Sequence, residues 1–333
     1  MEENIETNIV EIKYRKPATW RKFMARVIDV IVFGLLFGAF FIPMRAIVSS
    51  FSSYKEANNY IETEQIASGL YTKKDDGVII DLITYYNQDT YMSSGNKIKA
   101  LDEELIFFID EYCVGKVDSS RIENLKSDYK KFFLNEKFTY EGQKYFIEQD
   151  GKVIRNPDCK AELKKYYDEV YTDFFDSYLL GFFTKEIPDV YANYKLINNL
   201  VIFLEIPIPI VIASFLTYIL PTFIFKRNRY TLGRLAYKIG LIDDKCLAVK
   251  TKKILIKNAI LYFGEIILSI FTFGIPIIIS FTMSIVTKKQ QTFSEYMTGT
   301  VEIDSGHTKV FFSKEEVKVE LIDTHNKAID FKS

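Results

Sequence analysis

Residues 23–48 read FMARVIDVIVFGLLFGAFFIPMRAIV, an almost continuously apolar run. It exceeds the roughly 20 residues that a helix needs to cross a bilayer core of about 30 Å. Arg26 and Asp29 interrupt it three positions apart. Charged side chains are costly in hydrocarbon and persist there mainly when they pair, line a polar cavity or do chemistry. The spacing of three places both on one helix face, so we expect them to neutralise each other.

Two further apolar runs, at residues 199–225 and 254–286, are also long enough to span a membrane. The bulk composition hides this pattern, because a net charge of −1 and 26% charged residues are typical of a soluble chain. The run at 254–286 would form a helix of about 50 Å, which is too long for one crossing, and Gly274 and Pro276 interrupt it. We therefore expect two short, tilted or re-entrant helices there. A single kinked helix with an external C-terminus is the alternative.

The distribution of Lys and Arg predicts the orientation of the chain. Basic residues precede the first run and dominate the segment after the second run, so both sides are expected to be cytoplasmic. Residues 50–198 instead hold 27 Asp and Glu against 19 Lys and Arg, which an external segment tolerates. The first run lacks a small-residue cleavage site, so we expect it to be retained.

These features predict a multi-pass protein of the cell membrane with a cytoplasmic N-terminus. The predicted segments are a cytoplasmic tail at 1–22, a membrane helix at 23–48, an extracytoplasmic domain at 49–198, a membrane helix at 199–225, a basic cytoplasmic loop at 226–253, a broken helical hairpin at 254–286 and a cytoplasmic tail at 287–333.

Polar residues recur at helical spacing within the third run. They are Asn258, Tyr262, Glu265, Ser269 and Thr272. Steps of four and three place them on one face of a helix, while the neighbouring apolar residues face elsewhere. Glu265 is expected near the middle of the bilayer.

A third carboxylate, Glu205, lies in the second run, where the two prolines that follow it are expected to kink the helix. Asp29, Glu265 and Glu205 are then expected at the inner, middle and outer depths of the membrane. This arrangement is typical of a proton or cation path. Two structural alternatives stay open. Arg26 could extend to the headgroups with Asp29 as its partner, and polar stripes also hold helices together without transport.

Residues 49–198 are long enough for one compact domain. The pattern predicts helices at 103–112, 119–133 and 160–180 and a hairpin at Asp150-Gly151. The many tyrosines and phenylalanines are expected to form its core rather than a binding face. Cys113 and Cys159 could form a disulfide in this domain, although pairing cannot be read from sequence.

Three blocks, taken in order, resemble the RDD family of membrane proteins, which is named for one arginine and two aspartates. The blocks are Arg26 to Asp29, Thr231 to Arg234 continuing through Asp243 to Lys257-Asn258, and Gln291 to Thr300. They are similar to the family's Arg-x-x-Asp, to its Thr-Pro-Gly-Lys/Arg turn with a short strand pair and Arg-Asn, and to its closing Gln-Thr-Leu-His-Asp-x-x-x-Gly-Thr. The resemblance covers residues 20–48 and 199–303. It implies transport, with cation–proton exchange suggested for some members.

The chain departs from the family pattern in two of these blocks. This chain has Glu295 where the family has its second aspartate, Ser294 where the family has the neighbouring histidine, and Leu232 where the family has the proline of the turn. Gly299 is expected to end a helix in the left-handed conformation. Glu295 is then expected either to reach Arg26, which would give one arginine with two carboxylates, or to lie solvated on the surface.

Known catalytic motifs are missing from the sequence: there is no Walker A loop, GxSxG, HExxH or CxxC, so neither an enzyme nor a cofactor is expected. The two histidines, His307 and His325, lie in the C-terminal tail, which excludes a histidine-ligated metal within the membrane. Residues 226–257 lack the interleaved aromatic residues of nucleic-acid binding and are expected to contact anionic lipid.

The sequence thus predicts an all-α polytopic membrane protein with a mostly helical extracytoplasmic domain and a small cytoplasmic β element, formed by residues 237–249 and the tail after 300. The expected function is secondary transport of a cation or small solute, coupled to protons, by a homo-oligomer. Candidate residues are Arg26, Asp29, Glu265, Glu295, Glu205 and Asn258. The alternative is a membrane-anchored binding or assembly module that acts through the extracytoplasmic domain.

Overall fold

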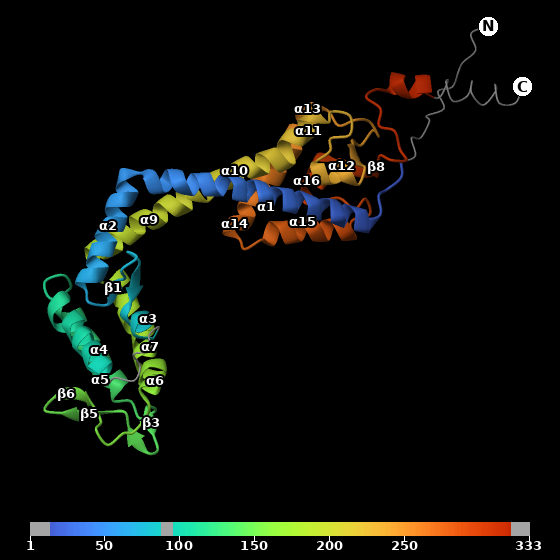
Figure 1. The fold of residues 1–333 in the computed structure, drawn as a ribbon. Coiled ribbons are helices and arrows are strands. Elements are labelled where there is room, and N and C mark those ends of the chain that lie inside the picture. Colours follow the sequence, from blue (N-terminus) through green and yellow to red (C-terminus); the bar gives the residue numbers. More distant parts are fainter. Residues whose placement is uncertain (1–13, 88–95, 321–333) are drawn as a thin grey trace, which may run out of the picture. The chain divides into compact units, whose positions relative to one another are not determined.

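The computed structural model describes residues 14–87 and 96–320 of the 333-residue chain (Figure 1). The outer parts of both predicted tails, His325 among them, lie outside the described residues. The chain is mostly helical and divides into two compact units. Unit 1 contains the residues up to Met44 and from Ile206 onward, and unit 2 spans Arg45–Glu205, close to the predicted extracytoplasmic domain.

The first two apolar runs form long helices. The first run is α1, Thr19–Ser50. The second belongs to a continuous helix, Pro188–Ile224, made of α9 Pro188–Leu200, a π-helical turn Val201–Glu205, α10 Pro207–Ser214, a π-helical turn Phe215–Ile219 and α11 Leu220–Ile224. Within the described residues, these two helices are long and apolar enough to cross a membrane by length and composition.

The third apolar run is broken at the predicted place. Its parts are α13 Thr251–Ala259, a π-helical segment Ile260–Ile267, α14 Leu268–Phe271 and, after a turn, α15 Ile275–Val286. Phe273 and Gly274 make the turn with φ angles of 50° and 85°, a conformation that glycine adopts without steric cost. Two helices therefore replace one overlong helix, and their placement in a membrane stays a prediction.

A small β element completes unit 1. Its parts are α12 Leu232–Ala236, β7 Ile239–Ile242, α16 Phe293–Thr298 and β8 Val301–Asp304. The two strands pair antiparallel with Gly240 opposite Ile303, and all of their residues are buried. This confirms the predicted pairing of residues 237–249 with the tail after residue 300.

Unit 2 combines short helices with three antiparallel hairpins. Besides α9 and the π-helical turn that follows it, the helices are α2 Ser52–Ala67, α3 Leu82–Asn87, α4 Asn96–Phe107, α5 Ser119–Phe133, α6 Leu163–Tyr166, α7 Thr172–Phe174 and α8 Leu180–Lys185, with π-helical turns at Phe108–Tyr112, Tyr167–Tyr171 and Phe175–Leu179. The hairpins are β1 Tyr71–Lys73 with β2 Ile79–Asp81, β3 Thr139–Tyr140 with β4 Gln143–Lys144, and β5 Phe146–Gln149 with β6 Lys152–Arg155. The last is the predicted hairpin, and Asp150 and Gly151 take the positive φ angles that a tight two-residue turn favours.

Aromatic side chains fill the core of unit 2, as predicted. The largest fully buried ones are Tyr145, Tyr166, Tyr167, Tyr171, Phe108, Phe133, Phe146, Phe174 and Phe183. The Phe133 ring packs edge-to-face on Phe146 and Phe174 at centroid distances of 4.9 and 5.2 Å. Burial of each such side chain contributes about 1.5–3 kcal/mol, which makes this core the main source of stability of the unit.

Cys113 and Cys159 are free thiols, so the disulfide considered for unit 2 is not formed. Cys113 is buried within the aromatic core, and Cys159 packs against that core from outside. A disulfide needs Cα atoms about 4.4–6.8 Å apart with matching Cβ directions, which the presence of two cysteines in one domain does not guarantee.

The buried carboxyl group of Asp102 is expected to make the stability of unit 2 depend on pH. Burial raises the pKa of this carboxyl to about 6, although a hydrogen bond from the Tyr171 hydroxyl at 2.6 Å opposes the shift. Because the folded pKa lies above the unfolded value, this group stabilises the fold below about pH 4, and the contribution is lost as pH rises to about 6. We expect a loss of at most about 3 kcal/mol over that range, measured as a falling melting temperature by near-ultraviolet circular dichroism.

Asp102→Asn keeps an acceptor for Tyr171 but cannot titrate. Its melting temperature should therefore change less than that of the wild type between pH 4 and 6. An identical pH profile in the two proteins would refute the assignment to Asp102.

Candidate functional site

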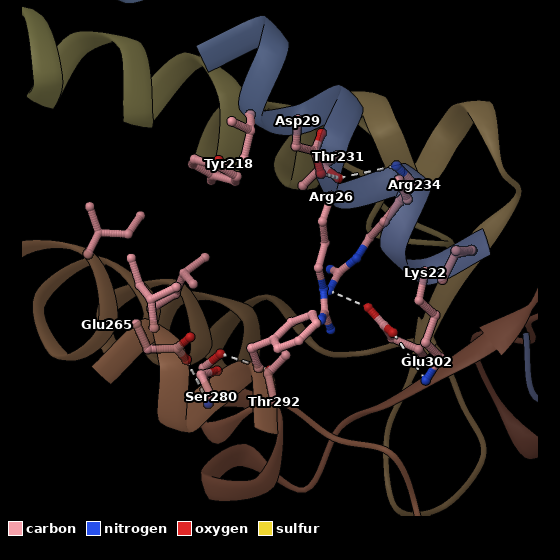
Figure 2. Close-up of a pocket in the computed structure, with 18 of the residues that line it drawn as sticks. Lys22, Arg26, Asp29, Tyr218, Thr231, Arg234, Glu265, Ser280, Thr292 and Glu302 are labelled. Carbon is pink, nitrogen blue, oxygen red and sulfur yellow. Dashed lines mark hydrogen bonds and ion pairs between the residues drawn. The ribbon is translucent and has the colours of Figure 1, made fainter. Parts of the chain in front are cut away.

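A cavity of about 470 Å³ lies within unit 1, and charged side chains converge on it (Figure 2). The charged residues that line it are Lys22, Arg26, Asp29, Arg234, Lys257, Glu265 and Glu302. They come from α1, α12, α13, the π-helical segment that follows α13, and β8. This volume falls in the range of about 300–1,000 Å³ that is usual for small-ligand sites.

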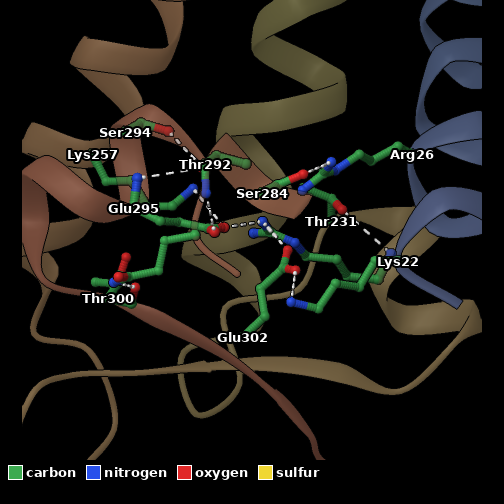
Figure 3. Close-up of polar contacts among 12 residues, drawn as sticks. Lys22, Arg26, Thr231, Lys257, Ser284, Thr292, Ser294, Glu295, Thr300 and Glu302 are labelled. Carbon is green, nitrogen blue, oxygen red and sulfur yellow. Dashed lines mark hydrogen bonds and ion pairs between the residues drawn. The ribbon is translucent and has the colours of Figure 1, made fainter. Parts of the chain in front are cut away.

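Arg234 is the centre of an ion-pair network on the cavity wall. Figure 3 shows Lys22, Lys257, Glu295 and Glu302 of this network. The Arg234 Nη2 atom donates to Glu295 Oε1 and to Glu302 Oε1, each at 2.7 Å. Lys22 Nζ lies 3.3 Å from the other oxygen of Glu302, and Lys257 Nζ lies 4.0 Å from Glu295. Each of these five side chains is buried or nearly so, which strengthens their attraction and makes the loss of one partner costly.

The electrostatics favour charged carboxylates in the β element. Burial opposes ionisation of Glu302, but the positive charges of Arg234, Arg26 and Lys22 outweigh it and lower its pKa to about 2. A hydrogen bond from Arg21 is the main reason why the pKa of Asp304 is also lowered to about 2, and the Nη1–Oδ2 distance is 2.7 Å. The start of α1 is therefore bound to β8 by ionised pairs.

Glu295 reaches the network because of how α16 begins and ends. Thr292 caps the helix and accepts from the Glu295 backbone N–H, while the Glu295 carboxylate accepts from the Thr292 N–H at 3.1 Å, which is a capping box. Gly299 ends the helix in the left-handed conformation, with φ of 57°, as predicted. Glu295 is fully buried, so the surface alternative for this residue is wrong.

Asp29 does not pair with Arg26. Its two carboxylate oxygens accept from the Thr231 hydroxyl at 2.6 Å and from the Gly233 N–H at 2.7 Å. Thr231 in turn caps α12 by accepting from the Arg234 N–H. Asp29 thus binds the turn that positions Arg234, the central residue of the ion-pair network.

Arg26 extends instead to α15, where its Nη1 atom donates to the Ser284 hydroxyl at 3.0 Å. The predicted Arg26–Asp29 pair and the predicted Arg26–Glu295 contact are therefore both wrong, since Arg234 takes Glu295. The physical reason is reach: Asp29 is short and is satisfied by the adjacent turn, whereas the long Arg26 side chain crosses to the next helix. Its Nη2 atom is buried and has no hydrogen-bond partner among the described residues.

Glu265, a residue of the polar stripe, lines the cavity and is buried. Its Oε1 atom accepts from the Ser294 N–H at 2.9 Å, at the start of α16. Asn258 from the same stripe is also buried on the cavity wall and donates to the Thr222 hydroxyl of α11 at 3.0 Å. The stripe thus joins three helices around the cavity.

Glu205 does not line this cavity. It belongs to unit 2, where its carboxylate is buried and lies 3.7 Å from the exposed guanidinium of Arg45. Of the three carboxylates that were predicted to lie at successive depths of the membrane, Asp29 and Glu265 line the cavity and Glu205 does not.

Four network residues, Lys22, Arg234, Lys257 and Glu302, were not among the candidates from sequence. Arg234 was visible only as the last residue of the family-like turn. The signal for Glu302 was a charged residue inside an otherwise buried strand, Val301–Asp304, which is costly unless it is paired. Lys22 precedes the apolar run and resembled an ordinary cytoplasmic flank.

In the described ranges, no three His, Cys, Asp or Glu side chains are grouped to hold a metal ion. The cavity carboxylates are bound to cations, a hydroxyl and backbone N–H groups. No protein-family model matches the chain, and neither the curated proteins nor the solved structures include a significant match.

Proposed function

We propose that this chain is a multi-pass membrane protein that transports a small solute or cation through the unit 1 cavity, coupled to protons. The two long apolar helices support a membrane location. The excess of Lys and Arg in residues 226–257 supports a cytoplasmic β element. The resemblance of the three sequence blocks to the RDD family supports transport in preference to enzymatic chemistry.

Glu265 carries the proposal. Its carboxylate is buried on the cavity wall, and within the described residues no Lys, Arg or His nitrogen lies within 4.0 Å of it. Of its two oxygens, only Oε1 has a hydrogen-bond partner in the described part of the chain, the Ser294 N–H. Glu265 can therefore take up a proton or a cation without first breaking an ion pair, as an exchange group in a membrane must do.

Asp29 is less suited to exchange. Thr231 and Gly233 already donate to both of its oxygens, so a proton would displace a structural hydrogen bond. We assign Asp29 to positioning of the turn that carries Arg234 and Glu265 to proton or cation exchange.

The test is proton movement in liposomes that contain the purified protein and an internal pH dye, with Na⁺, K⁺ and Li⁺ added in turn. Glu265→Gln should abolish cation-driven proton flux, because the amide keeps the hydrogen bond but cannot exchange a proton. Glu136→Gln removes an exposed carboxylate of unit 2 and should leave the flux unchanged. Equal flux in wild type and Glu265→Gln would refute the assignment.

Unit 2 favours a second candidate function, a membrane-anchored binding module. It has its own aromatic core and a surface pocket of about 380 Å³ lined by Tyr71, Tyr85, Tyr86 and Glu104, among others. If this module does the work, deletion of residues 55–195 should remove function, whereas Glu265→Gln should leave it intact.

A further inference from the structure

The unit 1 cavity has an apolar wall whose side chains are also exposed on the outer surface. Val30, Ile31, Ile277 and Phe281 line the cavity and are 42–60% exposed. By contrast, the buried charged lining residues are at most 5% exposed: Lys22, Asp29, Lys257, Glu265 and Glu302. The cavity therefore runs from a charged interior to an apolar mouth.

The mouth lies on α1 and α15, which the Arg26–Ser284 hydrogen bond joins. Both helices are strongly apolar, and α1 is long enough to cross a membrane. In a bilayer, exposed apolar side chains of such helices face the lipid tails. A hydrated ion entering there would lose its water at high cost, whereas an amphiphile would keep its chain in hydrocarbon throughout.

Arg26 determines which headgroup fits. Its Nη2 atom is buried without a hydrogen-bond partner in the part of the chain that the structure describes. The other cavity cations, Lys22, Arg234 and Lys257, each have a carboxylate within 4.0 Å, but Arg26 has none among the described residues. A guanidinium is always charged, and its planar fork of donors matches a carboxylate or phosphate.

We propose that the cavity binds a single-chain amphiphilic anion, with its headgroup at Arg26 and its chain along the apolar wall of α1 and α15. The volume of about 470 Å³ is appropriate for one chain and a small headgroup. The proposal rests on the proposed function, because it names the solute class of the same cavity.

The test uses the full-length protein in phosphatidylcholine nanodiscs and a dodecanoate analogue with a diazirine near the end of its chain. After irradiation, mass spectrometry should find the label on peptides containing residues 23–31 and 275–286. Unlabelled dodecanoate should compete with the probe, and dodecyltrimethylammonium, the cationic amphiphile of equal chain length, should not. Equal competition by both amphiphiles would overturn the proposal.

Arg26→Gln should reduce this labelling by about tenfold or more, the usual effect of removing a charge-assisted hydrogen bond from a buried site. Arg26→Lys keeps the charge without the fork and should give intermediate labelling. Arg227→Gln removes an exposed arginine from outside the cavity and should have no effect. Unreduced labelling of a folded Arg26→Gln protein would overturn the proposal, and Trp20 fluorescence checks folding.

Nanodiscs containing phosphatidylglycerol test whether an anionic bilayer lipid occupies the site instead. Suppressed labelling there would overturn the single-chain assignment in favour of a two-chain anionic lipid, and unchanged labelling supports a free single-chain anion. Labelling also separates this inference from the transport proposal, because Glu265→Gln should stop proton flux and still be labelled. Labelling without cation-driven flux in the wild type would refute cation–proton exchange alone, and flux without labelling would refute the amphiphile alone.

Discussion

Arg234→Met is expected to destabilise unit 1 by about 3 kcal/mol or more, because it leaves two buried carboxylates without their closest cation. The methionine matches the length of the arginine stem but donates no hydrogen bond to Glu295 or Glu302. Lys22 and Lys257 compensate only in part, since they lie 3.3 and 4.0 Å from these carboxylates. We expect a lower melting temperature for the purified protein in detergent.

Trp20 makes this measurement specific for unit 1. It is the single tryptophan of the chain, lies at the start of α1 and packs edge-to-face on Tyr237 at 5.8 Å. Arg227→Met is the matched control, because it removes an arginine that pairs on the surface with Glu316 and should change stability by less than about 1 kcal/mol. Adding Glu302→Gln to Arg234→Met should recover part of the loss. An unchanged melting transition in Arg234→Met would show that the network does not hold unit 1 together.

The elements that depend on local pattern could be predicted from the sequence. The first apolar run, the break at Gly274 and the hairpin at Asp150-Gly151 each depend on residues within one short stretch. Hydrophobic periodicity and turn chemistry fix such elements before any tertiary contact forms. Helical spacing also grouped Asn258 and Glu265, which are both buried on the cavity wall.

The partners within the site could not be predicted, because they come from distant positions. The spacing of Arg26 and Asp29 fixes a common helix face but not which atoms satisfy each side chain. Asp29 finds its donor Thr231 202 positions away, and Arg26 finds Ser284 258 positions away. Helical spacing identifies only partners about one turn away on the same helix and cannot detect a partner from a distant segment. A prediction from spacing therefore pairs Arg26 with Asp29, the nearest opposite charge, which is wrong. Long-range packing decided the site, whereas local periodicity decided the helices.

Gly233→Ala is expected to destabilise unit 1 about as strongly as the loss of Arg234, although it removes no charge. A Cβ at this position would overlap the carbonyl oxygen of Ala25 and lie 2.8 Å from its carbonyl carbon. It would also lie 3.0 Å from Cγ of Asp29. Because the clash is with the backbone of α1, no side-chain rotation can relieve it, and the turn must move away from the helix.

That movement breaks the two hydrogen bonds that Thr231 and Gly233 donate to Asp29 and shifts Arg234 from its carboxylates. Overpacking and a buried carboxylate without donors together cost about 3 kcal/mol or more. Gly34→Ala is the matched control, because its added Cβ meets no atom within 4 Å apart from the neighbouring backbone of its own helix, and alanine favours helix over glycine by about 1 kcal/mol. Trp20 fluorescence should therefore report a large drop in melting temperature for Gly233→Ala and a small rise for Gly34→Ala. Equal melting temperatures in the two variants would mean that the turn does not pack on α1, and the assignment of Asp29 as its anchor would fail.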